Sequence, residues 1–472
     1  MSKAADSLLA REKDRSAPLR LYLSASLLAL SGGFQFGYNL VLINPSQESF
    51  ISFLNASMRF EGEPKLTAAQ LNFRWSIYVS LLYVGMLVGA FLIQTMADSL
   101  GRKRTIVLTT VGQALAAACA ILAYFLVSHR LFAGSRLVLG LFQAVAVAVA
   151  PMYMSESSPP SCRGVISLST GLFVQIAVLV ASVIAMPQFL GSPTRWWLLY
   201  AIELSLLLLV LIFLPFLPES PAHLLARGRR EAAVRSIAFF HGDSSFVGTT
   251  VDCLAEAVAH KASPVGLFSV WSHSTHRLPV FTGCCVMLGM AASGIAVVNA
   301  YAVATLKRVG MEQAEAAWAN AGLCLVMVFG CLLSSVFIDR FGRRPLLLAT
   351  VSLIVVVNCL AVCLMHAFDV YKDARIGYLL FAALSTYALL FSAGPGPVAY
   401  FISSELCTQS ARGAAATWTA VVMAAVRTFV LAVYPSLTVL LGTAVAYFLM
   451  FVPLTLMVLI FLCFRLPETR HR

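Results

Sequence analysis

The stretch that decides the fold is DSLGRKR, residues 98–104, which lies between two long apolar segments. The same pattern returns as DRFGRRP at residues 339–345, where it is again flanked by apolar segments. Two further pairs recur in the same order, ESSPPSCRG at Glu156 with ELCTQSARG at Glu405, and PES at Pro218 with PET at Pro467. The offsets are 241, 249 and 249 residues, and three pairs in register indicate a duplicated unit.

The composition places this unit in a bilayer. Of the 472 residues, 60% are hydrophobic and only 11% are charged. A helix needs about 20 apolar residues to cross the hydrocarbon. Twelve such runs lie near residues 21–43, 73–95, 105–128, 136–155, 165–188, 196–217, 279–303, 317–338, 345–366, 376–401, 413–434 and 439–464. The sequence therefore predicts an all-α membrane protein with twelve transmembrane helices in two six-helix halves.

The predicted organisation has five parts. They are a cytoplasmic N-terminal tail (1–20), a six-helix bundle (21–217), a cytoplasmic linker with short helices (218–278), a second six-helix bundle (279–464) and a cytoplasmic C-terminal tail (465–472). The first 20 residues are charged and precede a full-length span without a small-residue cleavage site, so no signal peptide is expected.

The distribution of basic residues predicts the orientation. With both termini cytoplasmic, the inner segments hold 22 of the 33 lysines and arginines, as the positive-inside rule requires. The net charge of +12 then reflects topology and the anionic inner leaflet, so the expected partners include membrane lipids but no nucleic acid. We expect an integral multi-pass protein of the plasma membrane.

Enzyme chemistry is not indicated. Most of the 11 cysteines lie in apolar spans, no metal-ligand spacing appears, and the linker histidines His273 and His276 are not interpreted as a metal site. No nucleophile–base arrangement, cofactor motif or ATP-binding loop is present, so neither an enzyme nor a cofactor is expected. The one long outer loop, near 46–72, carries a glycosylation acceptor at Asn55, although this short pattern also arises by chance.

A family resemblance rests on these motifs together with FQFGYN (34–39), LPESP (217–221), GPGP (394–397) and LPET near the end of the chain. The set resembles the sugar porter branch of the major facilitator superfamily, and within it the facilitative glucose transporters of solute carrier family 2. The resemblance implies alternating access to a substrate held near the midplane between the halves. The prolines and glycines of GPGP interrupt the tenth span and predict a bend there, which serves as a structural kink, a moving gate or both.

The recurring charges predict a cytoplasmic gate that pairs cations and carboxylates across the two halves. The cations are Arg102, Arg163, Arg340, Arg343, Arg344 and Arg412, and the carboxylates are Glu156, Glu219, Asp339, Glu405 and Glu468. Several weak surface pairs acting together can bias a two-state equilibrium by a few kcal/mol. The alternative is that the basic residues only set the topology, but topology does not need the carboxylates.

The first span predicts passive transport. Proton-coupled sugar porters carry Asp at the last position of the FGY-x motif, whereas this chain has Asn39, as the passive carriers do. A proton-coupled symporter stays open as an alternative through Glu203, a carboxylate within the sixth span. A transport-silent nutrient sensor is a second alternative, although such sensors commonly bear long cytoplasmic tails.

The pocket departs from the family. The resemblance implies amides in the seventh span, but Met290, Ala291 and Ala296 stand in their place. The polar residues that could contact a ligand, or could instead serve packing, are Gln35, Asn39, Asn44, Gln175, Asn299, Tyr301, Tyr400 and Arg427. An arginine within a span marks a functional site by default, so Arg427 predicts either an ion pair, with Glu203 as the possible partner, or contact with an anion.

These observations predict facilitative uniport of a monosaccharide, a hexose, by alternating access. The alternative substrate is another small polar solute such as an organic anion or a sugar derivative.

Overall fold

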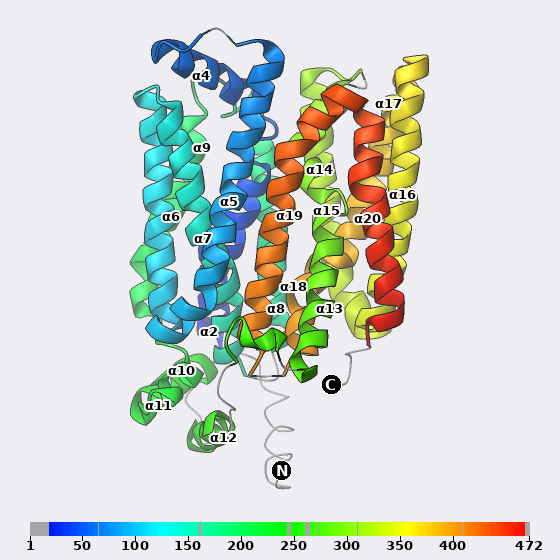
Figure 1. Ribbon diagram of the computed structural model, residues 1–472. Coiled ribbons are helices and arrows are strands. Elements are labelled where there is room, and N and C mark those ends of the chain that lie inside the picture. The colour runs from blue at the N-terminus through cyan, green and yellow to red at the C-terminus, as the bar shows by residue number, and fades with distance from the viewer. Residues whose placement is uncertain are drawn as a thin grey trace.

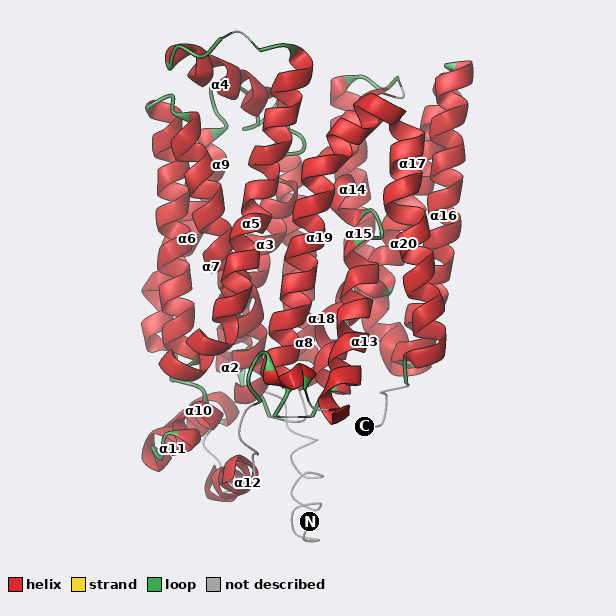
Figure 2. Cartoon of the chain, viewed as in Figure 1, coloured by secondary structure: helices red, strands yellow, loops and turns green. Residues whose placement is uncertain are grey.

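The computed structural model describes residues 18–64, 66–159, 163–242, 247–259, 265–272, 274–308, 310–408 and 410–467. Across these ranges the regular structure is helical and no strand occurs (Figure 2). Ten helices of the described part are long and apolar enough to cross a membrane, and the two remaining spans are the interrupted first span and the shorter fifth. The predicted class, twelve spans in two halves, is confirmed (Figure 1).

The N-terminal half contains the first six spans. They are α2 (Leu19–Ala29) continued by η1 (Leu30–Phe34) and α3 (Gln35–Val41), then α5 (Ala68–Leu100), α6 (Arg102–Phe125), α7 (His129–Ser157), α8 (Arg163–Ile184) and α9 (Trp197–Phe213) with η2 (Leu214–Phe216). The short helices α10 (Pro221–Ala226), α11 (Arg230–His241) and α12 (Val247–Ala259) follow below the bundle (Figure 1). This end of the molecule is called the linker end.

The C-terminal half begins after a short turn, η3 (Ser269–Trp271). Its spans are α13 (Ser274–Ala291) with α14 (Ile295–Arg308), α15 (Gln313–Phe341), α16 (Arg343–Tyr371), α17 (Ala374–Ala393) with α18 (Pro395–Leu406), α19 (Arg412–Leu441) and α20 (Thr443–Arg465). The two halves pack against each other mainly through α5 on α19 and α8 on α15.

The segment expected as an outer loop contains a helix, α4 (Gln47–Phe60), and the end of the molecule that carries it is called the α4 end (Figure 1). Its buried residues Phe50, Leu54 and Met58 recur every four positions, which is the spacing of one helical face. The Phe50 ring stacks on Trp75 and Phe132 with centroids 5.5 Å apart in each case. The sequence did not predict this helix, because a short amphipathic segment lacks the apolar length of a span.

Three spans are interrupted at the middle of the bundle. The first contains the π-helical turn η1, the seventh breaks between α13 and α14, and the tenth breaks at Gly394 within GPGP. Gly294 has φ +106°, a conformation that disfavours any side chain, and a Cβ there would lie 2.6 Å from the Tyr447 hydroxyl. Irregular backbone at this depth needs packed protein around it, and here the halves supply it.

Candidate functional site

A buried charge network occupies the centre of the N-terminal half. The Asn39 amide nitrogen donates to Glu203 Oε1 at 2.6 Å, and Arg136 Nη1 donates to Asn39 Oδ1 at 3.4 Å. Glu203 and Arg136 are almost completely buried. Asn39 therefore bridges a carboxylate and a guanidinium inside the membrane, and such charges are tolerated only when they are paired and hydrogen-bonded.

Arg136 is a site residue that the sequence reasoning missed. The fourth span is predicted to begin near residue 136, but α7 begins at His129, so Arg136 lies two helical turns inside the span. The amphipathic residues that precede Arg136 in the sequence could have shown that α7 extends further towards the α4 end.

Arg427 lies near the middle of α19, where the two halves meet. Its guanidinium carbon is 5.8 Å from the ring centroid of Phe36 and 5.6 Å from that of Tyr83, both in the N-terminal half. The ion pair with Glu203 that the sequence left open is not formed, because Glu203 Oε1 accepts from Asn39 and no ion pair of Arg427 occurs among the described residues.

The C-terminal side of the centre is largely apolar. The residues that stand in place of the seventh-span amides, Met290, Ala291 and Ala296, are all buried, as are Met327 and Met423. A hydrogen-bonded set lies nearby: Ser293 Oγ is 2.9 Å from Tyr387 OH, the Asn358 amide donates to Ser293 O at 2.9 Å, and Tyr447 OH donates to Asn358 Oδ1 at 3.0 Å. Sequence reasoning missed these groups, although Asn358 is a lone amide in an apolar run.

Two of the predicted ligand residues join the halves. The Asn44 amide donates to Asn320 Oδ1 at 3.2 Å and to Val298 O at 3.5 Å, and Asn44 Oδ1 accepts from the Val303 backbone N–H at 3.2 Å. Gln175 Nε2 donates to Ser392 Oγ at 3.1 Å, from α8 to α17. Both side chains therefore hold the halves together in this conformation.

The other predicted ligand residues differ in their surroundings. Gln35 is fully buried, and neither of its amide atoms has a hydrogen-bond partner in the described part of the chain. Asn299 is buried beside the seventh-span break, and Tyr400 OH lies 3.5 Å from the Met423 sulfur. A buried amide without partners is costly, which favours Gln35 as a residue that meets a ligand or water.

A cavity of about 370 Å³ opens at the α4 end between the halves. Its lining comes from both halves and includes Asn44 and Trp75 on one side and Tyr301, Lys307 and Tyr434 on the other. The rings of Tyr301 and Tyr434 stack with centroids 6.4 Å apart, and Tyr301 OH donates to Leu431 O at 3.4 Å. Tyr301 therefore forms part of the wall of the cavity at the α4 end.

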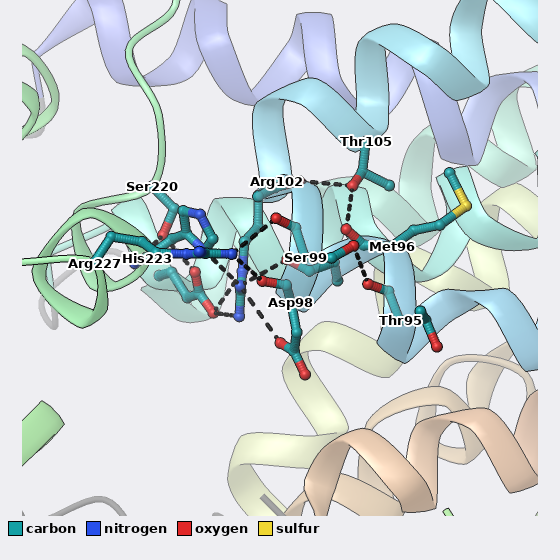
Figure 3. Close-up of polar contacts among 12 residues, drawn as sticks. Thr95, Met96, Asp98, Ser99, Arg102, Thr105, Ser220, His223 and Arg227 are labelled. Carbon is teal, nitrogen blue, oxygen red and sulfur yellow. Dashed lines mark hydrogen bonds and ion pairs between the residues drawn. The ribbon is translucent and has the colours of Figure 1, made fainter.

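Charged residues gather at the linker end of the N-terminal half (Figure 3). Arg102 Nη2 and Nε lie 2.9 and 3.2 Å from Glu156 Oε1. Glu219 Oε1 accepts from the backbone N–H groups of Arg102, Lys103 and Ser220, each at 2.9 Å. This cluster fixes the start of the linker against α6 and α7.

His223 stands beside the same arginine, with its Nδ1 3.2 Å from Arg102 Nη1. Burial lowers the pKa of His223, and the carboxylates of Glu219 and Glu156 oppose that shift. The imidazole is therefore held neutral next to the guanidinium.

The C-terminal half has the matching ion pair, with Arg343 Nε 3.6 Å from Glu405 Oε1, and Arg344 Nη2 donates to Cys463 O at 2.9 Å. At the linker end, the pairs Arg102–Glu156 and Arg343–Glu405 each join elements of one half, whereas at the α4 end Lys307 pairs with Glu48 across the halves. Pairing across the halves at the linker end stays a prediction, because the side chains of Arg163, Asp339 and Arg340 and all of Glu468 lie outside the described residues, as does His273. Arg412, at the start of α19, is described and belongs to the same predicted gate.

A second polar cluster lies at the α4 end. Glu61, Glu63 and His129 have potential ligand atoms within 4.8 Å of one another, but Arg130 pairs with Glu61 at 2.9 Å and Arg74 with Glu63 at 2.5 Å. The hydrogen bond from Arg74 lowers the pKa of Glu63. Both carboxylates are thus already neutralised by arginines.

The glycosylation acceptor lies close to this cluster. Asn55 is in α4, and Ser57 of the same motif is buried with its hydroxyl donating to Val127 O at 2.6 Å. Modification of Asn55 stays a prediction.

The arrangement of the two halves defines the class of protein. Two six-helix halves that meet at a buried polar centre, with a cavity at one end and a charged cluster at the other, form a major facilitator transporter. The structure of the proton:xylose symporter XylE bound to 6-bromo-6-deoxy-D-glucose superimposes with a TM-score of 0.76 at 20% identity, over 95% of this chain and 96% of that one. The partially occluded, inward-open xylose transporter XylE from E. coli gives a TM-score of 0.76 at 18% identity, over 94% and 99% of the two chains.

The family follows from the sequence. A model of the sugar (and other) transporter family matches residues 25–472, and the chain belongs to that family. It is 28% identical over 458 residues to the human solute carrier family 2, facilitated glucose transporter member 7, covering 96% of this chain and 88% of that protein. It is 29% identical over 461 residues to member 4 from Mus musculus, covering 94% and 87%. The chain is therefore a transporter and not an enzyme.

Proposed function

We propose that the protein is a uniporter that carries a monosaccharide of hexose size across the plasma membrane by alternating access, with both termini in the cytoplasm. The observation that carries the proposal is the position of Asn39, whose amide holds Glu203 and accepts from Arg136. An amide does not titrate, so the site between these two charges offers no proton-binding group of its own. The relatives named as facilitated glucose transporters support passive transport.

The cavity at the α4 end supports the alternating-access part of the proposal. It is lined by both halves, and the stacked Tyr301 and Tyr434 are part of its lining. The charged cluster of Arg102, Glu156 and Glu219 lies at the opposite end. Rocking of the halves would exchange access between these two ends.

A proton-coupled symporter is the second candidate, and one observation favours it. Glu203 Oε2 is buried without a hydrogen-bond partner in the described part of the chain. A proton on that oxygen would remove the cost of an unsolvated charge. Transport would then be coupled through Glu203 rather than through the first span.

The test is uptake of radiolabelled D-glucose and D-fructose into proteoliposomes that contain only this protein, with and without an imposed proton gradient. A uniporter brings the internal sugar concentration to the external one and no further, whatever the gradient. Accumulation above the external concentration that is lost in Glu203→Gln would establish the symporter instead. The absence of saturable flux for every monosaccharide would overturn the proposal as a whole.

A further inference from the structure

Arg427 is a buried cation at the centre of the membrane. It lies fifteen residues after the first residue of α19 and fourteen before the last, and its side chain is 2% exposed. A charge at this depth is costly unless it meets a partner, water or a ligand, and it therefore marks a functional site by default.

The partners of Arg427 in this conformation do not neutralise it. The ring faces of Phe36 and Tyr83 cover the guanidinium, which is a favourable but weak interaction. Its Nε and Nη1 atoms have no hydrogen-bond partner among the described residues. At least two N–H donors of the planar guanidinium group are therefore unpaired in a buried site.

The side chains around Arg427 indicate which chemical class of ligand would fit beside it. Arg427 belongs to α19 of the C-terminal half and the rings that cover it, Phe36 and Tyr83, belong to the N-terminal half, so the site lies between both halves, where alternating access places a substrate. One turn away, Met423 has no hydrogen-bond donor, and its thioether sulfur is a weak acceptor that the Tyr400 hydroxyl already approaches at 3.5 Å. A guanidinium fork matches the two oxygens of a carboxylate, and the aromatic rings can cover the apolar face of a sugar ring.

We propose that Arg427 binds the carboxylate of an anionic monosaccharide, so that the substrate is a sugar acid such as a hexuronate. This inference rests on the proposed monosaccharide transport and names its substrate class. The carboxylate and the Arg427 guanidinium together carry no net charge, so the anion can enter a buried site in which an unpaired charge would be costly. Transport of the anion carries one negative charge across the membrane per cycle.

The experiment uses D-glucuronate and its neutral amide, D-glucuronamide, which have nearly the same size. Binding is measured first, as the shift of the thermal unfolding midpoint of the purified protein with each compound. Uptake into proteoliposomes is then measured with and without an inside-positive potential set by potassium and valinomycin. We expect tighter binding of the acid than of the amide by at least tenfold, and faster uptake of the acid alone when the interior is positive.

Two variants and one control connect these results to the residue. Arg427→Gln should weaken D-glucuronate at least tenfold and leave D-glucuronamide almost unchanged, and Arg427→Lys should fall between because it keeps the charge but not the fork. Arg375→Gln, which removes an exposed arginine at the start of α17, should behave as the wild type. Arg427→Lys keeps the test informative if the glutamine variant does not fold.

Each contrary result has a distinct meaning. Equal binding of acid and amide by the wild type overturns the proposal, and retained D-glucose flux would then leave the monosaccharide uniporter standing. Equal loss of both ligands in both Arg427 variants also overturns it, because the residue is then structural. The thermal-shift comparison needs no flux, so it decides the role of Arg427 even if the proposed transport fails.

Discussion

Asn44 should set how often the α4 end of the transporter opens. Its side chain joins the end of the first span to α14 and α15 of the other half through the three hydrogen bonds described above. Asn44→Ala removes all three and creates no new charge. If alternating access separates the halves at this end, the variant should spend more time open.

The size of the effect follows from the geometry. The two bonds of 3.2 Å are ordinary hydrogen bonds, each with a net contribution of about 1 kcal/mol, whereas the contact of 3.5 Å to Val298 O is at the limit and is counted as zero. The closed state therefore loses about 2 kcal/mol, which raises the open-to-closed ratio about 30-fold.

The native Cys324 can report this change. It is buried on α15, one helical turn beyond Asn320, and contacts Ser182 of the other half. In a background without the other cysteines, a membrane-impermeant maleimide added at the α4 end should label Cys324 at a rate proportional to the open fraction. We expect labelling of Asn44→Ala to be about 30-fold faster than that of the parent.

Asn358→Ala is the matched control. Asn358 is as buried as Asn44, at 1% exposed, and also makes short hydrogen bonds, but its partners Ser293 and Tyr447 lie in its own half. Its replacement should lower stability without speeding the labelling. Labelling of Asn44→Ala within twofold of the parent, or no faster than in Asn358→Ala, would refute the gating role.

Two other perturbations test local packing and charge. Gly37→Ala should destabilise the protein by about 1–3 kcal/mol, because the new Cβ would lie 2.1 Å from the Val174 carbonyl oxygen. The measurement is the thermal unfolding midpoint in detergent, which should fall. Gly134→Ala is the control and should leave the midpoint unchanged, because no atom lies within 4 Å of the position of its new Cβ. Because the pKa of His223 is lowered in the folded protein, its proton binds better to the unfolded chain, so stability should fall as the pH drops below about 6.5. His223→Gln should flatten that part of the midpoint-against-pH curve, and an unchanged slope would contradict the assignment.

The fold could be predicted because it depends on features that are local in sequence. Apolar length gives the spans, and the motif repeats give the duplication. GPGP was expected to bend the tenth span, and the structure ends α17 and begins α18 there. The helix α4 was missed because an amphipathic segment of fourteen residues in an outer loop lacks the apolar length that identifies a span.

The site was harder to predict because its contacts join distant residues. The sequence singled out Asn39, Glu203 and Arg427 as polar groups in apolar spans, but it could not show that Asn39 bridges Glu203 to Arg136 rather than leaving Glu203 for Arg427. Which residue pairs with Glu203 depends on which faces of the first, fourth and sixth spans pack against one another. The interhalf role of Asn44 likewise needs the packing of α3 against α14 and α15.

The breaks in the seventh and tenth spans have a mechanical consequence. The half-helix after the first break, α14, lies towards the α4 end, and the half-helix after the second, α18, lies towards the linker end (Figure 1). Both half-helices belong to the C-terminal half, and each lies towards a different end of the molecule. If each half-helix closes its own end, both ends can be shut at the same time, so we expect the protein to move solutes one at a time without leaking ions or water.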